Sequence, residues 1–142
     1  MQLLDHVSIT VRNLASVVPF YKAIMSALNA TVVYEDEDAI GFGERNSPHS
    51  DGHSYISVFQ SEHASADPRR HWCFRAASIE QVHAFHVAGL STGGRDEGSP
   101  GVRPYHPGYY AAFLLDPEGN QVEVVFHQAK TSQVLHYAEE PG

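Results

Sequence analysis

Cysteine, basic residues and long apolar runs are all scarce in this sequence. A single cysteine, Cys73, excludes an internal disulfide and a metal site built of thiolates. The 9 basic and 17 acidic residues give a net charge of −8, which argues against nucleic acid or an anionic membrane surface as a partner. No apolar run reaches the length of a membrane span, and Met1–Thr10 lacks the basic region of a signal peptide. A cytoplasmic protein is therefore expected.

What remains is the composition of an ordinary globular protein. With 142 residues, 42% of them hydrophobic and 18% charged, the chain can form one domain or two fused half-domains around a sizeable core. Histidine is the one residue type in excess, with 10 copies. The excess suggests metal binding or acid–base chemistry, or has no particular meaning.

The first half of the chain predicts one helix among four strands. Leu3–Val11 alternates between apolar and polar residues, which is typical of a half-buried strand. Asn13 or Ser16 can cap a helix that runs to about Leu28, and Pro19 falls in its first turn if Ser16 is the cap. Further strands are expected near Ala30–Glu35, near Ala39–Gly43 and over His53–Gln60, with a loop over Glu44–Gly52.

The second half repeats this order. Ser78 and Gln81 form the pattern of a capping box before a helix over Ile79–Leu90, on which His83 and His86 are expected to face solvent. The predicted strands are His71–Ala77, a short one near Gly94–Glu97, and the hairpin of Tyr109–Leu115 and Gln121–Phe126; a long loop is expected over Gly98–Gly108.

The two halves align with each other. HVSITVRNLASVVPFY, which starts at His6, matches HWCFRAASIEQVHAFH, which starts at His71, without a gap; YISVFQ over QVEVVF then places Ser57 over Glu123. The repeat predicts an α+β fold of two βαβββ modules, residues 1–60 and 71–127, with a connector over 61–70 and a tail over 128–142. Each helix covers one face of its sheet, and the other faces curve into an open, eight-stranded cup.

Strand alternation brings His6, His71 and Glu123 onto the open faces of this cup. A carboxylate in the middle of an apolar strand is costly to bury alone, so Glu123 requires a partner. Two imidazoles and a carboxylate are the ligand set of many iron, manganese, nickel and zinc sites, and they leave positions open for substrate. The sequence therefore predicts one divalent metal ion. The competing interpretation is a hydrogen-bonded cluster without metal.

Several other side chains are candidates for the same cavity. His106, Tyr109 and Tyr110 lie in an aromatic segment at the expected rim, where they either serve acid–base chemistry or pack. Arg75 is a candidate for binding an anionic substrate, although exposed arginines are common. The remaining substrate-binding candidates share the inward alternation: Ser8, Tyr55 and Ser57.

The segments DHVSITVRNLASVVPFY, HWCFRA and AAFLLDPEGNQVEVV are similar to those of the vicinal oxygen chelate superfamily, which includes glyoxalases, bleomycin resistance proteins and extradiol dioxygenases. The resemblance spans roughly Met1–His127 and implies paired βαβββ modules with metal ligands at His6, His71 and Glu123. The superfamily has four ligand positions, and the remaining one, second in chain order, holds Ser57, where glyoxalase I has a carboxylate or an equivalent ligand. Phe113 stands where fosfomycin-modifying thiol transferases and extradiol dioxygenases have a tyrosine.

The resemblance therefore implies a metal-dependent lyase, dioxygenase or thiol transferase acting on a small oxygenated substrate by Lewis-acid catalysis. The alternative is a non-catalytic protein that binds a bleomycin-like antibiotic, for which an acidic chain suits a cationic drug. In this superfamily the cup forms within one chain or between exchanged modules of two chains. A homodimer is expected; in its exchanged form His6 would come from one subunit and His71 and Glu123 from the other.

Overall fold

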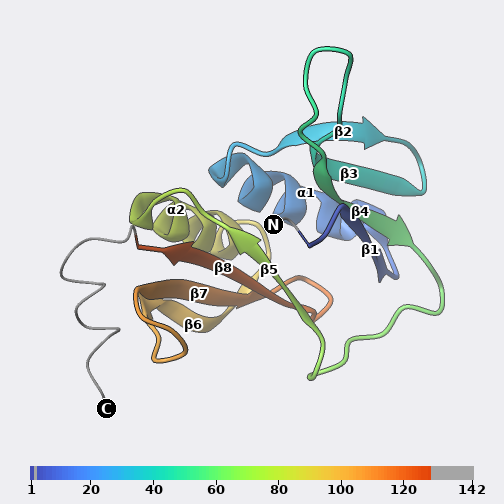
Figure 1. Cartoon of the computed structure of the whole chain (residues 1–142). Helices are drawn as coiled ribbons and strands as arrows, with labels where there is room; N and C mark the ends of the chain where they lie inside the picture. Colours follow the sequence, from blue (N-terminus) through green and yellow to red (C-terminus); the bar gives the residue numbers. More distant parts are fainter. Residues whose placement is uncertain (2, 129–142) are drawn as a thin grey trace.

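Two βαβββ modules follow one another along the chain (Figure 1). The computed structural model describes residue 1 and residues 3–128, so the predicted tail lies, from residue 129 onward, outside the described residues. The first module contains β1 (His6–Val11), α1 (Leu14–Ala27), β2 (Thr31–Glu35), β3 (Ala39–Glu44) and β4 (Ser54–Gln60). The second contains β5 (His71–Arg75), α2 (Ile79–Leu90), β6 (Arg95–Val102), β7 (Tyr109–Leu115) and β8 (Gln121–His127). The predicted fold class is confirmed.

The two sheets have the same topology. Their strand orders are β1-β4-β3-β2 and β5-β8-β7-β6, with a parallel pair at one edge and antiparallel pairs elsewhere. Ser57 pairs with Ser8 in the first sheet, and Glu123 pairs with Cys73 in the second, so the positions matched by the repeat are equivalent in space. The eight strands form two separate four-stranded sheets in the described chain, and these are not closed into a barrel.

Both helices begin where short polar side chains cap them. The Asn13 side chain accepts a hydrogen bond of 3.2 Å from the Ser16 amide, so Asn13 is the cap and Pro19 lies inside α1, beyond its first turn. The Ser78 hydroxyl accepts from the Gln81 amide at 3.1 Å, and the Gln81 side chain accepts from the amide before the cap. None of the helices in the described part of the chain is long and apolar enough to cross a membrane.

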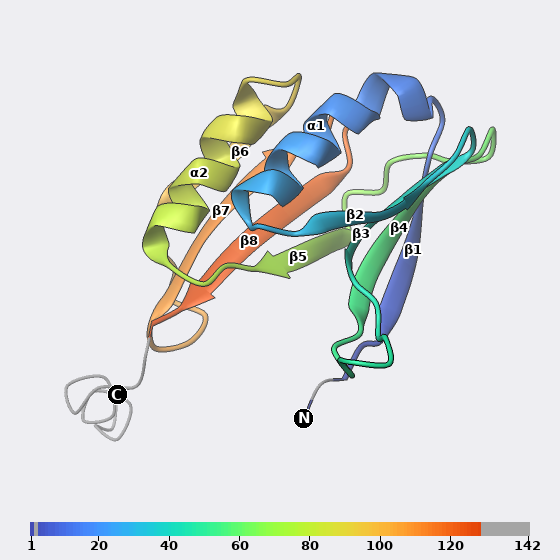
Figure 2. The same ribbon diagram turned by 90° about the horizontal axis from the view of Figure 1, so that it is seen from above.

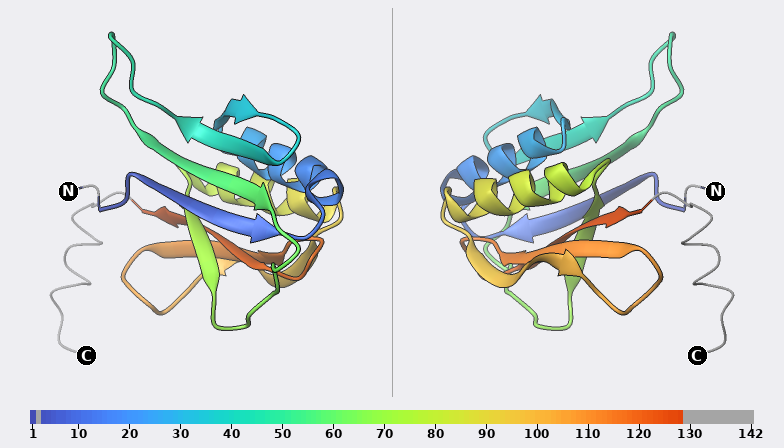
Figure 3. Two further views of the ribbon diagram at one scale, coloured as in Figure 1. Left: turned by 90° about the vertical axis from the view of Figure 1, so that its right-hand side faces the viewer. Right: turned by 90° about the vertical axis from the view of Figure 1, so that its left-hand side faces the viewer.

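The modules pack through their helices. α1 and α2 lie side by side, and Figure 2 shows the two sheets diverging from them. Gly89 on α2 permits this approach, since a Cβ there would meet the side chains of Phe20, Ile24 and Leu114. The buried apolar side chains of both modules form one continuous core. Figure 3 shows β1 and β4 in front of the helices on one side and behind them on the other, so the first sheet keeps an open face.

The turn between β7 and β8 also joins the modules. Buried Asp116 accepts hydrogen bonds from the Asn120 side chain at 2.9 Å and from the Tyr21 hydroxyl of α1 at 2.7 Å. Glu118 accepts from the amides of Arg12 and Asn13, at 2.7 and 2.8 Å, at the start of α1. A carboxylate at a helix N-terminus is favourable because the first amides lack partners within the helix.

β6 is longer than the sequence predicts. Its pairing with β7 continues to Val102, into the segment expected to be a loop. The register shifts between Asp96 and Gly98 and again between Gly98 and Gly101. Such bulges accommodate an irregular sequence within a ladder, and they leave no regular alternation from which the strand could be predicted.

Candidate functional site

The face of each sheet that its helix does not cover carries the predicted polar residues. On β1, Ile9 and Val11 are buried beneath α1, whereas His6 and Ser8 are exposed on the opposite face. On β5 the exposed residues are His71, Cys73 and Arg75. We refer to these two surfaces as the first and second open faces.

Glu123 is the centre of the second open face. Its carboxylate is only 3% exposed, and its Oε1 atom lies 3.1 Å from Nε2 of His71. The hydroxyl of Tyr109 donates a hydrogen bond to Oε2. The carboxylate in the apolar strand therefore has two polar partners, which offset the cost of its burial.

Two neighbours of Glu123, the Tyr109 hydroxyl and the Cys73 thiol, have raised pKa values. Burial and the hydrogen bond to Glu123 raise the pKa of the Tyr109 hydroxyl above its ordinary value, because an ionised phenol would face a carboxylate. Burial and the charge of Glu123 likewise raise the pKa of the Cys73 thiol. Cys73 is thus a poor nucleophile.

Aromatic rings surround Tyr109 at the edge of this face. The ring of His106 lies 5.9 Å from that of Tyr109, and the rings of Tyr105 and His127 meet it edge-on at 5.2 and 5.4 Å. The predicted rim segment thus supplies both a packed aromatic cluster and one phenol that reaches Glu123.

His6 has a different set of partners on the first open face. Its Nδ1 atom lies 2.5 Å from Oδ1 of Asp5, and Nε2 of His53 lies 3.2 Å from the same oxygen. The ring of Tyr55 stacks on that of His6, with centroids 5.0 Å apart and planes inclined by 8°. The hydrogen bond with His6 lowers the pKa of the Asp5 carboxyl. A carboxylate on Nδ1 orients an imidazole and leaves Nε2 available to a ligand.

Within one chain the predicted triad is divided. Among the described residues, the only group of three whose ligand atoms lie within 4.8 Å of one another is Asp5, His6 and His53. His71 and Glu123 are adjacent to each other on the second open face, whereas His6 belongs to the first.

The structure places the other candidates in different surroundings. Ser8 and Arg75 are exposed on the open faces, as predicted. Ser57 is buried because the Tyr34 hydroxyl covers it at 2.7 Å. Tyr110, predicted at the rim and as a substrate-binding residue, lies instead on the other face of β7 from Tyr109, toward α2, where its hydroxyl is 2.7 Å from Nε2 of His83.

The expectation that His86 faces solvent is wrong. His86 is 7% exposed, and its Nε2 atom lies 2.8 Å from Oδ1 of Asp96. His86 belongs to the face of α2 that packs on β6. Asp96 is the second residue of β6, whose register on β7 shifts after this position. The sequence pattern of β6 therefore did not predict that Asp96 contacts His86.

Two further residues of the first open face had no sequence signal. Tyr34 reaches this face because the register of β2 shifts between Val32 and Tyr34, which reverses the alternation. Arg45 lies beyond the end of β3, in the predicted loop, with its guanidinium 4.8 Å from the ring centroids of both Tyr34 and Tyr55. His53 and Asp5 could have been linked through the register of β1 on β4, in which His6 pairs with Tyr55.

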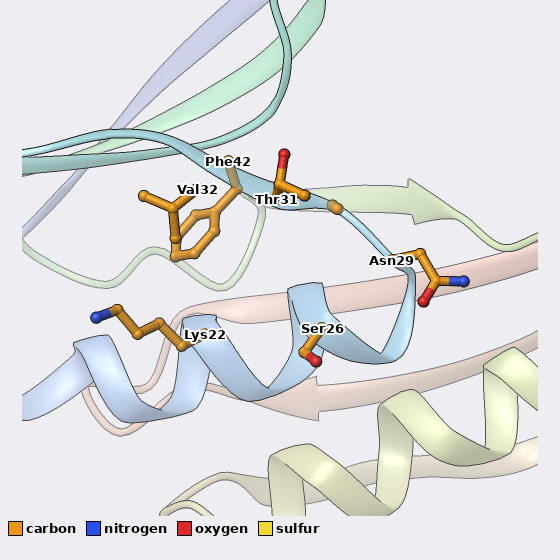
Figure 4. A pocket seen from close by; sticks show the side chains of 7 residues that line it. Lys22, Ser26, Asn29, Thr31, Val32 and Phe42 are labelled. Carbon is orange, nitrogen blue, oxygen red and sulfur yellow. The ribbon is translucent and has the colours of Figure 1, made fainter.

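A groove of about 740 Å³ lies elsewhere, on the helix-covered side of the first module (Figure 4). Lys22 and Ser26 of α1 form one wall, and Val32 and Phe42 of the sheet form the other. Lys22 is 3.3 Å from Glu35, so its charge is paired. None of the predicted site residues lines this groove.

Residues 3–124 match the sequence model of the family described as "Glyoxalase/Bleomycin resistance protein/Dioxygenase superfamily". A search of curated proteins found no match. Among solved structures, a glyoxalase/bleomycin resistance protein from Albidiferax ferrireducens T118 is 27% identical, with a TM-score of 0.72 over 88% of this chain and 98% of that one. The fosfomycin resistance protein FosX from Listeria monocytogenes is 16% identical, with a TM-score of 0.62 over 94% and 98%.

Proposed function

Because the chain belongs to the Glyoxalase/Bleomycin resistance protein/Dioxygenase superfamily, we propose that it is a divalent-metal-dependent enzyme acting on a small oxygenated substrate. The observation that carries the proposal is the buried Glu123 carboxylate with His71 against it on an open face. An imidazole nitrogen and a carboxylate oxygen are suitable ligands for Mn, Fe, Zn or Ni. The donor set therefore fits a metal, with a third ligand still required.

His6 of a second copy is the third ligand in this proposal. His6 and the pair of His71 and Glu123 lie on different open faces of one chain, so a homodimer that places the first open face on the partner's second face brings the three together. Exposed apolar side chains on the open faces support this pairing, since burying them is favourable. They include Leu4, Phe59 and Tyr105.

The residues have distinct roles in this mechanism. A bound divalent ion supplies Lewis-acid stabilisation of negative charge on a substrate oxygen. The Tyr109 hydroxyl, whose pKa is raised, donates a hydrogen bond to Oε2 of Glu123, while Oε1 faces His71. Asp5 fixes the orientation of the His6 ring. His106, exposed beside Tyr109, is the candidate acid or base at the rim, and Ser8 is the candidate contact for a substrate oxygen.

A second ligand set requires no partner. Asp5, His6 and His53 offer two nitrogens and an oxygen within 4.8 Å of one another in the same chain. His71 and Glu123 are favoured because their carboxylate is buried, with the Glu123 side chain 4% and the Asp5 side chain 62% exposed; the imidazoles of His71 and His6 are similarly exposed, at 45% and 51%. An exposed cluster binds metal less selectively than a buried one that excludes water.

The competing function is binding without chemistry. The net charge of −8 favours a cationic ligand such as a bleomycin-like drug, and the division of the triad within one chain is consistent with a pocket that holds no metal. Metal content separates the two functions.

The test is elemental analysis of the purified protein after incubation with Mn, Fe, Ni or Zn and removal of unbound ions. We expect one ion per chain in the unmodified protein, and its loss in His6→Ala and Glu123→Gln. His63→Ala is the matched control, because that side chain is 88% exposed in the connector. Metal retained in Glu123→Gln but lost in His53→Ala would assign the ion to the single-chain set. No ion in the unmodified protein would favour the binding function.

A further inference from the structure

The first open face holds one cation in an aromatic clamp. The guanidinium of Arg45 lies 4.8 Å from the ring centroids of both Tyr34 and Tyr55. Stacking on aromatic faces fixes the plane of a guanidinium and leaves its N–H edge available for hydrogen bonds.

The sheet is shaped to hold this clamp. Gly41 lies on the same face as Ser57 and Tyr55, and a Cβ at position 41 would come within 2.4 Å of the Tyr34 ring. The absence of a side chain thus lets Tyr34 lie against the strand. Its hydroxyl, 2.7 Å from the Ser57 hydroxyl, fixes the far end of the ring.

Arg45 has no acceptor of its own in the described part of the chain. Other arginines donate to backbone oxygens, as Arg103 does to Ser99 and Gly101 at 2.8 and 2.9 Å, whereas no hydrogen bond or ion pair involves the Arg45 guanidinium among residues 1 and 3–128. The carboxylate of the adjacent Glu44 turns toward Gly52. An acidic protein thus presents a held, unneutralised cation on this face.

The clamp is next to His6. The same Tyr55 ring that faces Arg45 stacks on His6, so the imidazole and the guanidinium are separated by at most about 10 Å. One small molecule can span this gap, with one end at His6 and an oxyanion at the N–H edge of Arg45, which matches carboxylate and phosphate oxygens in pairs.

We propose that Arg45, clamped by Tyr34 and Tyr55, binds the anionic group of the substrate, so that the substrate is a small organic acid carrying a carboxylate or a phosphate. This assignment deepens the function proposed above and rests on it for the role of His6. From the sequence, Arg75 on the second open face was one candidate for an anion-binding arginine; within the described residues, Arg45 lies over two aromatic rings and Arg75 lies over none.

The test is a titration of the full-length protein with three probes that share one carbon skeleton: glycerate, glycerol 3-phosphate and glycerol. Binding is followed by NMR through the ring signals of Tyr34, Tyr55 and His6. We expect one or both acids to bind and glycerol not to bind, and the bound acid identifies the anion. Arg45→Gln is expected to weaken acid binding at least tenfold, and Arg45→Lys by less, because lysine keeps the charge without the planar fork.

Arg69→Gln is the control, since it removes the same charge from the connector. Unchanged acid binding in Arg45→Gln, equal binding of glycerol, or no binding of either acid to the unmodified protein would overturn the proposal. If Arg45→Gln does not fold, acid binding is compared between Arg45→Lys and Tyr34→Phe. The phenylalanine variant keeps the ring and is expected to bind within about threefold of the unmodified protein.

Titrations with and without added metal separate this proposal from the previous one. Arg45-dependent acid binding in a protein that retains no ion would contradict the metal enzyme and leave the anion site standing. A retained ion together with acid binding that does not depend on Arg45 would support the metal enzyme and contradict the anion site.

Discussion

The Tyr21 hydroxyl donates a 2.7 Å hydrogen bond to the Asp116 carboxylate, across 95 positions of sequence and between the two modules. Both groups are buried, and burial together with the charge of Asp116 raises the pKa of Tyr21 well above its ordinary value. This bond and the two that Glu118 accepts fix the β7–β8 turn against α1. This contact joins the two modules in addition to the packing of α1 on α2 and the shared core.

Removing the Tyr21 hydroxyl is expected to destabilise the fold. Tyr21→Phe removes one of the two hydrogen bonds that Oδ2 of buried Asp116 accepts, and the loss of a hydrogen bond to a charged group costs about 1–3 kcal/mol in the free energy of unfolding. Urea unfolding followed by fluorescence or circular dichroism measures this loss. Tyr105→Phe, at a side chain that is 57% exposed, is the control and should change stability by little. Equal stability of the two variants would show that the inter-module bond contributes nothing measurable.

Glu118 is expected to stabilise the start of α1. Glu118→Gln keeps the shape of the side chain but removes its charge, so the amides of Arg12 and Asn13 lose a charged acceptor. The expected loss is about 1 kcal/mol in the free energy of unfolding. The same unfolding assay applies, with Glu37→Gln as the exposed control. A smaller loss in Glu118→Gln than in the control would contradict this role.

The pair of His86 and Asp96 predicts a pH dependence of stability. The hydrogen bond with His86 lowers the pKa of Asp96 below its ordinary value of 3.8. A carboxyl with a lowered pKa stabilises the fold above the unfolded-state value, and this contribution disappears as the pH falls through the folded-state value. Asp96→Asn should therefore flatten the decrease in stability below about pH 5. Glu97→Gln is the control, and identical pH profiles of the two variants would refute the prediction.

Subunit mixing tests whether two chains share one metal site. If His6 comes from one subunit and Glu123 from the other, a heterodimer of His6→Ala and Glu123→Gln has one site with both substitutions and one intact site. Co-expression with two affinity tags isolates the heterodimer, and elemental analysis should find one ion per dimer where each parent holds none. Sites formed within single chains would stay empty in the mixture. A sedimentation mass near the 15.7 kDa of one chain would exclude the shared site.

Local patterns in the sequence specified the elements of this fold. The alternation of Gln121–Phe126 predicted which side chains share a face, and the internal repeat predicted that Glu123 and His71 lie on the same face of one module. In the structure, Nε2 of His71 lies 3.1 Å from Oε1 of Glu123. The cap at Ser78 was predicted, and Asn13 was one of two candidates for the first cap, because capping depends on a few adjacent residues. Strand alternation repeats every 2 residues and the helix every 3.6, so a short segment of sequence is enough to recognise either element.

Only the tertiary structure decided which faces meet. Helix-to-helix packing, permitted at Gly89 and supported by the Tyr21 hydrogen bond, holds His6 on one open face and Glu123 on another, although the alternation of β1 and β8 is as predicted. A single register shift before Tyr34 carried that ring to the open face and formed the clamp for Arg45. Such contacts join residues far apart in the chain, and their free energy depends on packing that no local pattern encodes.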